Sequence, residues 1–317
     1  IDAVLYSISQ VFAGSPMFMH GFTNTYGLYP HFLEPIFRII GLSYQSFSLV
    51  MALMISLSFI FIFLFLWGII QNRLILFIGF TSYLWMGYIF GKAISHDYYF
   101  QYFPLRTIFP SSLLFLSALY LKYSSKIVYF GSFILYSVAI LWNPDSGIVV
   151  FGAWFLLLLY LELRKKDLFQ LIKGITYHAV IALFLLIMTF SLYALYIKFR
   201  YGSYPNLLTM VESIGIFRKL GYMMLSMPLK HPWYLYLFIC LIGILIPIAG
   251  FFQRRIDNKN ALILLTSLVS VGAFAYYQGR SHTYTFLNIV GYMFILMTIF
   301  ADRLLMHINS IKKHDSY

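Results

Sequence analysis

The acidic residues and polar motifs of this chain are of types that can do chemistry together. Carboxylates stand at Asp2, Glu34, Asp97 and Asp145, and the triplet Arg280-Ser281-His282 adds cationic and donor side chains. A carboxylate can take the proton from an attacking hydroxyl group. Arginine and histidine can stabilise charge that develops on a departing phosphate, arginine through a bidentate fork. These residue types therefore fit transfer of a group from a phosphate-linked donor.

Three further positions fit the same chemistry. Arg106 lies in a proline-flanked segment, where it could bind a phosphate or anchor itself among lipid headgroups. Trp142 and Asn143 stand beside Asp145 and could contact a sugar face. The run Asn-Pro-Asp-Ser-Gly that contains Asp145 is also typical of a turn, and it predicts that Asp145 caps the helix that follows.

Each remaining candidate also has a structural alternative. Asp2 is a suitable N-cap for a helix that begins at the next residue. Asp97, which follows His96, could pair with a nearby basic residue and order its loop. The Arg280-Ser281-His282 triplet could be a turn at the level of the lipid headgroups. Tyr26 belongs to a residue type that more often forms the interfacial aromatic belt than binds a ligand.

The composition indicates that a membrane positions these groups. Of the 317 residues, 61% are hydrophobic and only 10% are charged, which suits a lipid solvent and not water. The net charge of +12 comes largely from Lys and Arg in short loops between apolar runs, so it indicates membrane topology and not nucleic-acid binding. Cys240 is the only cysteine, which excludes a disulfide within the chain and predicts a small core residue.

Long apolar runs predict an all-α, polytopic transmembrane protein with about nine spans. Alternate connections are rich in Lys and Arg, and the positive-inside rule places those connections in the cytoplasm. The candidate residues then share the extracytoplasmic side, with the N-terminus of the chain outside and its C-terminus inside. The predicted spans are residues 45–71, 74–93, 108–122, 126–142, 146–163, 175–197, 233–252, 260–277 and 283–303.

The chain is predicted to form a single transmembrane domain over residues 1–317, with an outer loop at 1–42 and the spans within 43–317. In the outer loop, apolar residues at helical spacing predict a short surface helix over Ala3–Ala13. A second apolar stripe, within 198–232, could be a lid over a lipid-facing groove or an interfacial helix that only packs. Because the chain starts without Met just before Asp2, we expect a native span to precede it.

The sequence does not show the residues that several other classes of protein require. The predicted spans carry no Asp, Glu, Lys or Arg near their centres, which disfavours an ion-coupled transporter. His178 lies toward the cytoplasmic end of its span and is predicted to be structural. The spacing of His20, His31 and His96 gives no support to a metal site, and no cofactor is predicted. A role for a divalent cation stays open, but the sequence does not indicate one.

The first 45 residues resemble the first outer loop of integral-membrane glycosyltransferases of the C-type (GT-C) superfamily, which use polyprenyl-phosphate sugars. Members of that family carry an acidic residue after their first span, a surface helix, a glycine and a Tyr-Gly/Pro segment. The resemblance implies that Asp2 is the catalytic acidic residue and that the sugar is transferred with inversion. This chain lacks the second acidic residue of many members, and Asp97 or Glu34 could substitute. The matching stretches are Ile1-Asp2-Ala3 to Ala13-Gly14, Asn24 to Pro30, and Pro35 to Leu42.

We therefore expect a hexosyl or pentosyl transferase in the cell envelope, in a bacterial plasma (inner) membrane. It would move a sugar from a polyprenyl-phosphate donor to a saccharide, lipid or protein acceptor on the extracytoplasmic face. One alternative is a flippase or transporter of a lipid-linked saccharide, and another is an O-antigen-type polymerase or ligase. In the expected enzyme, Asp2 is the general base, with Asp97 as its substitute or as a group that positions the acceptor. The predicted substrate-binding residues are Arg106, Arg280, His282, Asp145, Asn143, Trp142, Tyr26 and His96.

Overall fold

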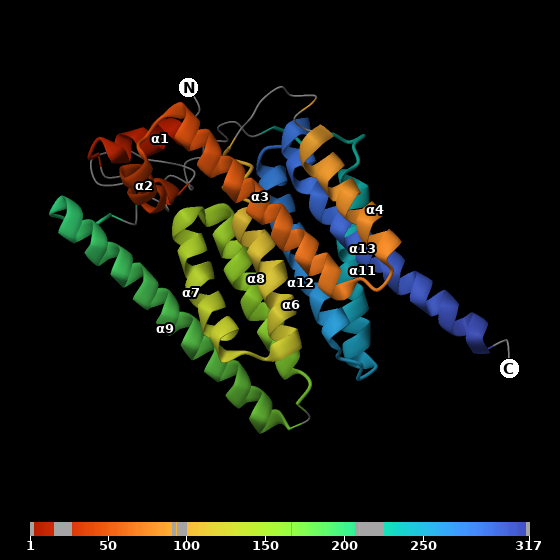
Figure 1. Cartoon of the computed structure of the whole chain (residues 1–317). Coiled ribbons are helices and arrows are strands. Elements are labelled where there is room, and N and C mark those ends of the chain that lie inside the picture. Colours follow the sequence, from red (N-terminus) through yellow and green to blue (C-terminus); the bar gives the residue numbers. More distant parts are fainter. Residues whose placement is uncertain are drawn as a thin grey trace.

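The computed structural model describes residues 3–15, 27–90, 93, 100–165, 167–206, 209 and 225–314. All regular secondary structure within these ranges is helical (Figure 1). The predicted all-α class is therefore confirmed. The apolar stripe predicted within 198–232 falls mostly on residues outside these ranges.

Each predicted span coincides with a helix, and one helix continues into a π-helical turn. Several helices extend beyond the apolar run that predicted them, and α9 is the clearest case because its 34 residues reach about 51 Å. The helices are α3 (Tyr44–Ile69), α4 (Arg73–Leu84) with η1 (Trp85–Ile89), α6 (Ile108–Tyr123), α7 (Lys126–Trp142), α8 (Pro144–Glu162), α9 (Leu168–Tyr201), α11 (Trp233–Phe252), α12 (Asn258–Gly279) and α13 (Thr283–His314).

Six of these helices are long and apolar enough to cross a membrane: α3, α8, α9, α11, α12 and α13. The apolar segments 73–89, 108–123 and 126–142 are shorter. The 16 residues of α6 reach about 24 Å, less than the roughly 30 Å of a typical hydrocarbon core. The chain is thus a multi-pass membrane protein, and the count of nine spans stays a prediction.

Short polar side chains cap the starts of many of these helices. Ser43 begins α3 with a capping box that includes Ser46. The side-chain oxygens of Ser125, Asn143 and Asp257 accept backbone N–H groups in the first turns of α7, α8 and α12. These caps satisfy donors that a helix cannot pair internally.

The helices pack into a bundle whose centre holds α7, α8 and α12, with α9 along one flank and α4, α11 and α13 on the other (Figure 1). Large aromatic side chains such as Trp154, Tyr136 and Phe133 are fully buried in its core. Outward positions of α9, among them Leu183, Phe184 and Ile187, are exposed and apolar. Such a surface suits contact with lipid acyl chains, which are apolar as well.

Two residues inside the bundle have the structural roles predicted for them. Cys240 is buried in α11. His178 of α9 is buried and joins three helices, because its ring accepts or donates to Tyr129 of α7 at 2.7 Å and Glu162 of α8 at 3.3 Å. Both residues therefore serve packing within the bundle.

Two short helices cover one end of the bundle. The helix predicted over Ala3–Ala13 is present as α1 (Ala3–Phe12), and it buries Val4, Ile8 and Val11. The second helix, α2 (Tyr29–Ile40), was not predicted from the sequence. Its signals are a proline in the first turn and Gly41 at its end, where φ is 81°. An internal proline, Pro35, obscures that pattern.

Candidate functional site

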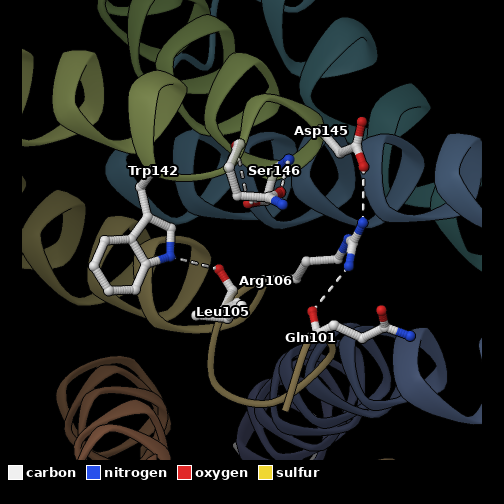
Figure 2. A network of polar contacts seen from close by, with 7 residues as sticks. Gln101, Leu105, Arg106, Trp142, Asp145 and Ser146 are labelled. Atoms are coloured by element: carbon white, nitrogen blue, oxygen red, sulfur yellow. Dashed lines mark hydrogen bonds and ion pairs between the residues drawn. The ribbon is translucent and has the colours of Figure 1, made fainter. Parts of the chain in front are cut away.

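Arg106 lies in a tight turn before α6, where several segments of the chain meet (Figure 2). Its Nη2 donates to Asp145 Oδ2 at 2.9 Å, and its Nη1 donates to the Gln101 carbonyl oxygen at 2.9 Å. The neighbouring Leu105 carbonyl accepts the indole N–H of Trp142 at 3.1 Å. The structure thus joins the turn before α6 to the start of α8, which places two predicted site residues in direct contact.

Aromatic rings hold the Arg106 side chain in place. Its guanidinium carbon lies 4.2 Å from the ring centre of Tyr276 and 5.9 Å from that of Tyr102. The side chain is 11% exposed, against 34% for Asp145. Burial acts to lower the pKa of Arg106, but Tyr276 and Asp145 outweigh burial, so the net shift is upward. The site therefore contains a permanently charged, largely buried cation.

This ion pair borders a cavity of about 50 Å³ between α6, α8, α12 and α13. The volume is enough for a few water molecules or one small polar group. Both members of the ion pair contribute to its wall. The other polar lining residues include Tyr102, Tyr276, Asn288 and Tyr292.

Asn143, and not Asp145, caps α8, which corrects the prediction from the sequence. Asn143 Oδ1 accepts the Ser146 backbone N–H at 3.0 Å and the Ser146 hydroxyl at 2.9 Å. Asp145 occupies the first turn, where its carboxylate is favoured by the helix dipole and turns toward Arg106. Because the cap uses the Asn143 side chain and buries it, Asn143 positions Asp145.

Trp142 packs between α2 and α6 and holds the turn that carries Arg106. Its side chain is buried, and its ring contacts Tyr29 and Phe32 of α2 and Phe109 of α6. Together with the hydrogen bond to Leu105, these contacts fix the turn that carries Arg106. The structure therefore places Trp142 in the core and not among the residues that line the cavity.

Arg280 and His282 lie where α12 passes into α13. Arg280 interacts electrostatically with Tyr276, the ring that also lies against Arg106. His282 is exposed, and within the described residues its contacts are local: Nδ1 accepts the Tyr284 backbone N–H at 3.2 Å, and the two rings lie 4.8 Å apart. The structure thus brings Arg280 close to the site and gives His282 a role at the start of α13.

The predicted site residues Asp2, Tyr26, His96 and Asp97 lie outside the described residues. The described chain that follows Tyr26 packs against the end of α7. After Tyr26, Gly27 has φ of 102°, and a side chain there would overlap the Trp142 carbonyl. The Leu28 N–H then donates to the Leu141 carbonyl at 2.8 Å. The outer loop therefore returns to the bundle at the end of α7, next to the Arg106 turn.

Tyr102, Tyr276, Asn288 and Tyr292 were not predicted as site residues. A weak signal exists for the last two, because they are polar residues four apart in an apolar run and so share one face of α13. No such signal distinguishes Tyr102 or Tyr276 from the other tyrosines near span ends. Among the described residues, no group of three His, Cys, Asp or Glu side chains could hold a metal ion.

Comparisons with family models, curated proteins and solved structures found no match to this chain. Its class therefore rests on its helices, which make it a multi-pass membrane protein with a charged cavity at one end of the bundle.

Proposed function

We propose that this chain is an integral-membrane glycosyltransferase that moves a sugar from a polyprenyl-phosphate donor to an acceptor on the extracytoplasmic face. The observation that carries the proposal is the Arg106 guanidinium, held by Asp145 and Gln101 at the wall of a cavity. A largely buried arginine in a membrane protein is costly and suits an anionic group that arrives from the lipid phase.

The size of the cavity limits what it can hold. Its volume of about 50 Å³ is far below the roughly 300 Å³ or more of a typical ligand pocket. It suits the phosphate or one sugar hydroxyl, so in this proposal the sugar ring lies at its mouth. Asp145 is 34% exposed there and can accept a hydrogen bond from a hydroxyl of the sugar or acceptor.

The proposed reaction is a single displacement. The acceptor hydroxyl oxygen forms a bond to the anomeric carbon, and the bond from that carbon to the phosphate oxygen breaks with its electron pair staying on the phosphate. Arg106 stabilises the charge on the departing phosphate. Asp2 takes the hydroxyl proton, as the resemblance to C-type glycosyltransferases implies, with Asp97 as its substitute or acceptor-positioning partner.

The test uses the purified chain in lipid nanodiscs with a panel of radiolabelled polyprenyl-phosphate sugars and acceptor extracts. Binding of polyprenyl monophosphate is measured separately. We expect Asp2→Asn to abolish sugar transfer and to retain polyprenyl-phosphate binding, because only the base is lost.

Two outcomes would contradict the proposal. Unchanged transfer by Asp2→Asn would remove Asp2 as the base. Movement of the lipid-linked sugar across vesicle membranes, with no transfer by the unmodified chain to any acceptor, would instead favour a carrier of lipid-linked saccharides.

A further inference from the structure

A second group of charged side chains lies where α2 meets the end of α9, and the proposed sugar transfer does not use it. Glu34 of α2 accepts hydrogen bonds from Arg38 Nε, one turn further along, and from Arg200 Nη2 of α9 at 2.7 Å. The Glu34 side chain is 2% exposed, whereas those of Arg38 and Arg200 are 46% and 36% exposed. This Glu34–Arg38–Arg200 cluster therefore hides its carboxylate and presents two guanidiniums.

The cluster carries surplus positive charge. Two guanidiniums against one carboxylate leave a net charge of +1. Each guanidinium has five N–H donors. The hydrogen bonds to Glu34 and Phe12 use Nε and Nη2 of Arg38 and Nη2 of Arg200, and the Arg200 guanidinium also interacts with Tyr201, whose ring centre lies 5.8 Å away. Arg38 Nη2 is held by the Phe12 carbonyl at 2.9 Å. The exposed edges of both side chains thus retain donors, and Glu34 holds them together against their mutual repulsion.

The surroundings of the cluster are apolar and exposed. Ile39, next to Arg38 on α2, and Phe199, next to Arg200 on α9, are each 86% exposed. Further exposed apolar side chains on the same two helix ends are Ile36, Ile40, Leu195 and Tyr196. In a membrane protein, apolar side chains of this kind contact acyl chains while neighbouring arginines reach the headgroups. These apolar side chains would contribute nothing to the binding of a free anion from water.

We propose that the Glu34–Arg38–Arg200 cluster is a binding site for the phosphate of an anionic phospholipid. Two guanidiniums held by one buried carboxylate offer paired, charge-assisted donors to phosphate oxygens. The exposed side chains of Ile39 and Phe199 contact the acyl chains of the same lipid. The bound lipid joins α2 to α9 and so stabilises the attachment of the outer helices to the bundle.

The test compares the full chain in nanodiscs of pure phosphatidylcholine with nanodiscs that also contain phosphatidylglycerol. Native mass spectrometry measures the phosphatidylglycerol that the protein retains, and thermal unfolding measures the stabilisation. We expect phosphatidylglycerol to raise the Tm of the unmodified chain. Arg200→Gln should weaken its binding about tenfold, since one charge-assisted contact is lost.

Lys198→Gln is the matched control, because it removes the same charge two residues away. Lys198 Nζ bonds the Tyr204 hydroxyl at 3.1 Å and not Glu34, so its loss should leave the binding nearly unchanged. Equal weakening by Lys198→Gln would reduce the effect to general surface charge and overturn the site. Stabilisation by inorganic phosphate equal to that by phosphatidylglycerol would overturn the lipid assignment. If Arg200→Gln lacks a cooperative thermal transition in phosphatidylcholine, Arg38→Gln provides the same comparison at a side chain that is 46% exposed.

Discussion

At the scale of single residues, the Arg106–Asp145 pair joins two positions that are 39 residues apart in the sequence. Each residue was predicted separately as part of a site, because each is a charged group beside a turn at the outer end of a span. Their mutual contact was not predicted, since it depends on how α6 and α8 pack. The rings of Tyr102 and Tyr276 were missed for the same reason.

Arg106→Gln should reduce sugar transfer by about 100-fold or more, because it removes a donor that stabilises the departing phosphate. Arg106→Lys keeps the charge without the planar fork, so its rate of sugar transfer should lie between those of the unmodified chain and Arg106→Gln. Initial rates across donor concentrations would measure both effects. The control is Arg73→Gln, since Arg73 also binds a backbone carbonyl and lies 3.9 Å from a tryptophan ring centre, but at the α3–α4 connection. Equal losses for Arg106→Gln and Arg73→Gln would exclude a specific role.

His31 makes the stability of the protein depend on pH. Its side chain is buried in α2, and burial lowers its pKa to about 4, against an opposing effect of Glu34 and a smaller lowering by Arg200. The folded state therefore disfavours the protonated ring. This contribution to stability is fully present above the unfolded pKa of about 6.5 and is lost as the pH falls toward 4.

Between pH 7 and pH 5, His31 should cost the folded state about 2 kcal/mol. Thermal unfolding at the two pH values, for the unmodified chain and for His31→Gln, would measure the part of the pH dependence that disappears with the ring. His307→Gln is the control, because His307 is exposed at the end of α13. An identical pH dependence for His31→Gln and the unmodified chain would show that His31 is not buried in its neutral form.

At the scale of elements, the start of α8 is set by close packing against α7. A side chain at Gly147 would overlap the Ala139 carbonyl of α7, whereas a side chain at Gly152, also in α8, would meet no atom within 4 Å. The first turn of α8 carries Asp145 and the Asn143 cap, so this contact also positions the ion pair.

Gly147→Ala should lower the free energy of unfolding by about 1–3 kcal/mol, because the helices must separate to admit the methyl group. Gly152→Ala should leave it unchanged or raise it by up to about 1 kcal/mol, because alanine favours the helix. Chemical denaturation of both variants in the same detergent would compare them directly. A loss of stability for Gly152→Ala as large as that for Gly147→Ala would contradict the assigned packing.

Apolar runs predicted the positions of the long helices well, but two elements depended on neighbours. The π-helical turn η1 contains Gly87, where a side chain would come within 3.1 Å of the Gly291 backbone of α13. Its backbone is therefore shaped by a helix that lies about 200 residues further along the chain. The short helix α2 was missed because its pattern is interrupted by Pro35 and because packing against α1 supports it.

At the scale of the whole molecule, the connections between helices gather at two opposite ends of the bundle. The turn before α6, the start of α8, the end of α12 and the outer helices α1 and α2 lie at one end of the bundle, and the α6–α7 and α8–α9 connections lie at the other (Figure 1). The positive-inside rule predicts that the second end faces the cytoplasm.

Cysteine labelling in intact cells would determine the orientation. Cys240→Ala removes the only cysteine, which is buried. In that background, a membrane-impermeant maleimide should label Ser15→Cys in intact cells and Ser124→Cys only after permeabilisation. Both positions are exposed, and Ser15 follows α1 whereas Ser124 lies in the α6–α7 connection at the other end of the bundle. The reverse pattern would place the cavity on the cytoplasmic side and would exclude an extracytoplasmic transferase.

The sequence by itself determined that this is a helical membrane protein, because apolar runs of the length of a bilayer can satisfy their backbone groups only as helices. It also predicted that the candidate charged residues cluster in alternate connections. Only the tertiary structure decided which of these residues meet. Arg106 pairs with Asp145, and Glu34 pairs with Arg200, because the packing of the helices brings together segments that are far apart in sequence. Such pairings depend on helix packing, which side-chain shape fixes and hydropathy does not encode.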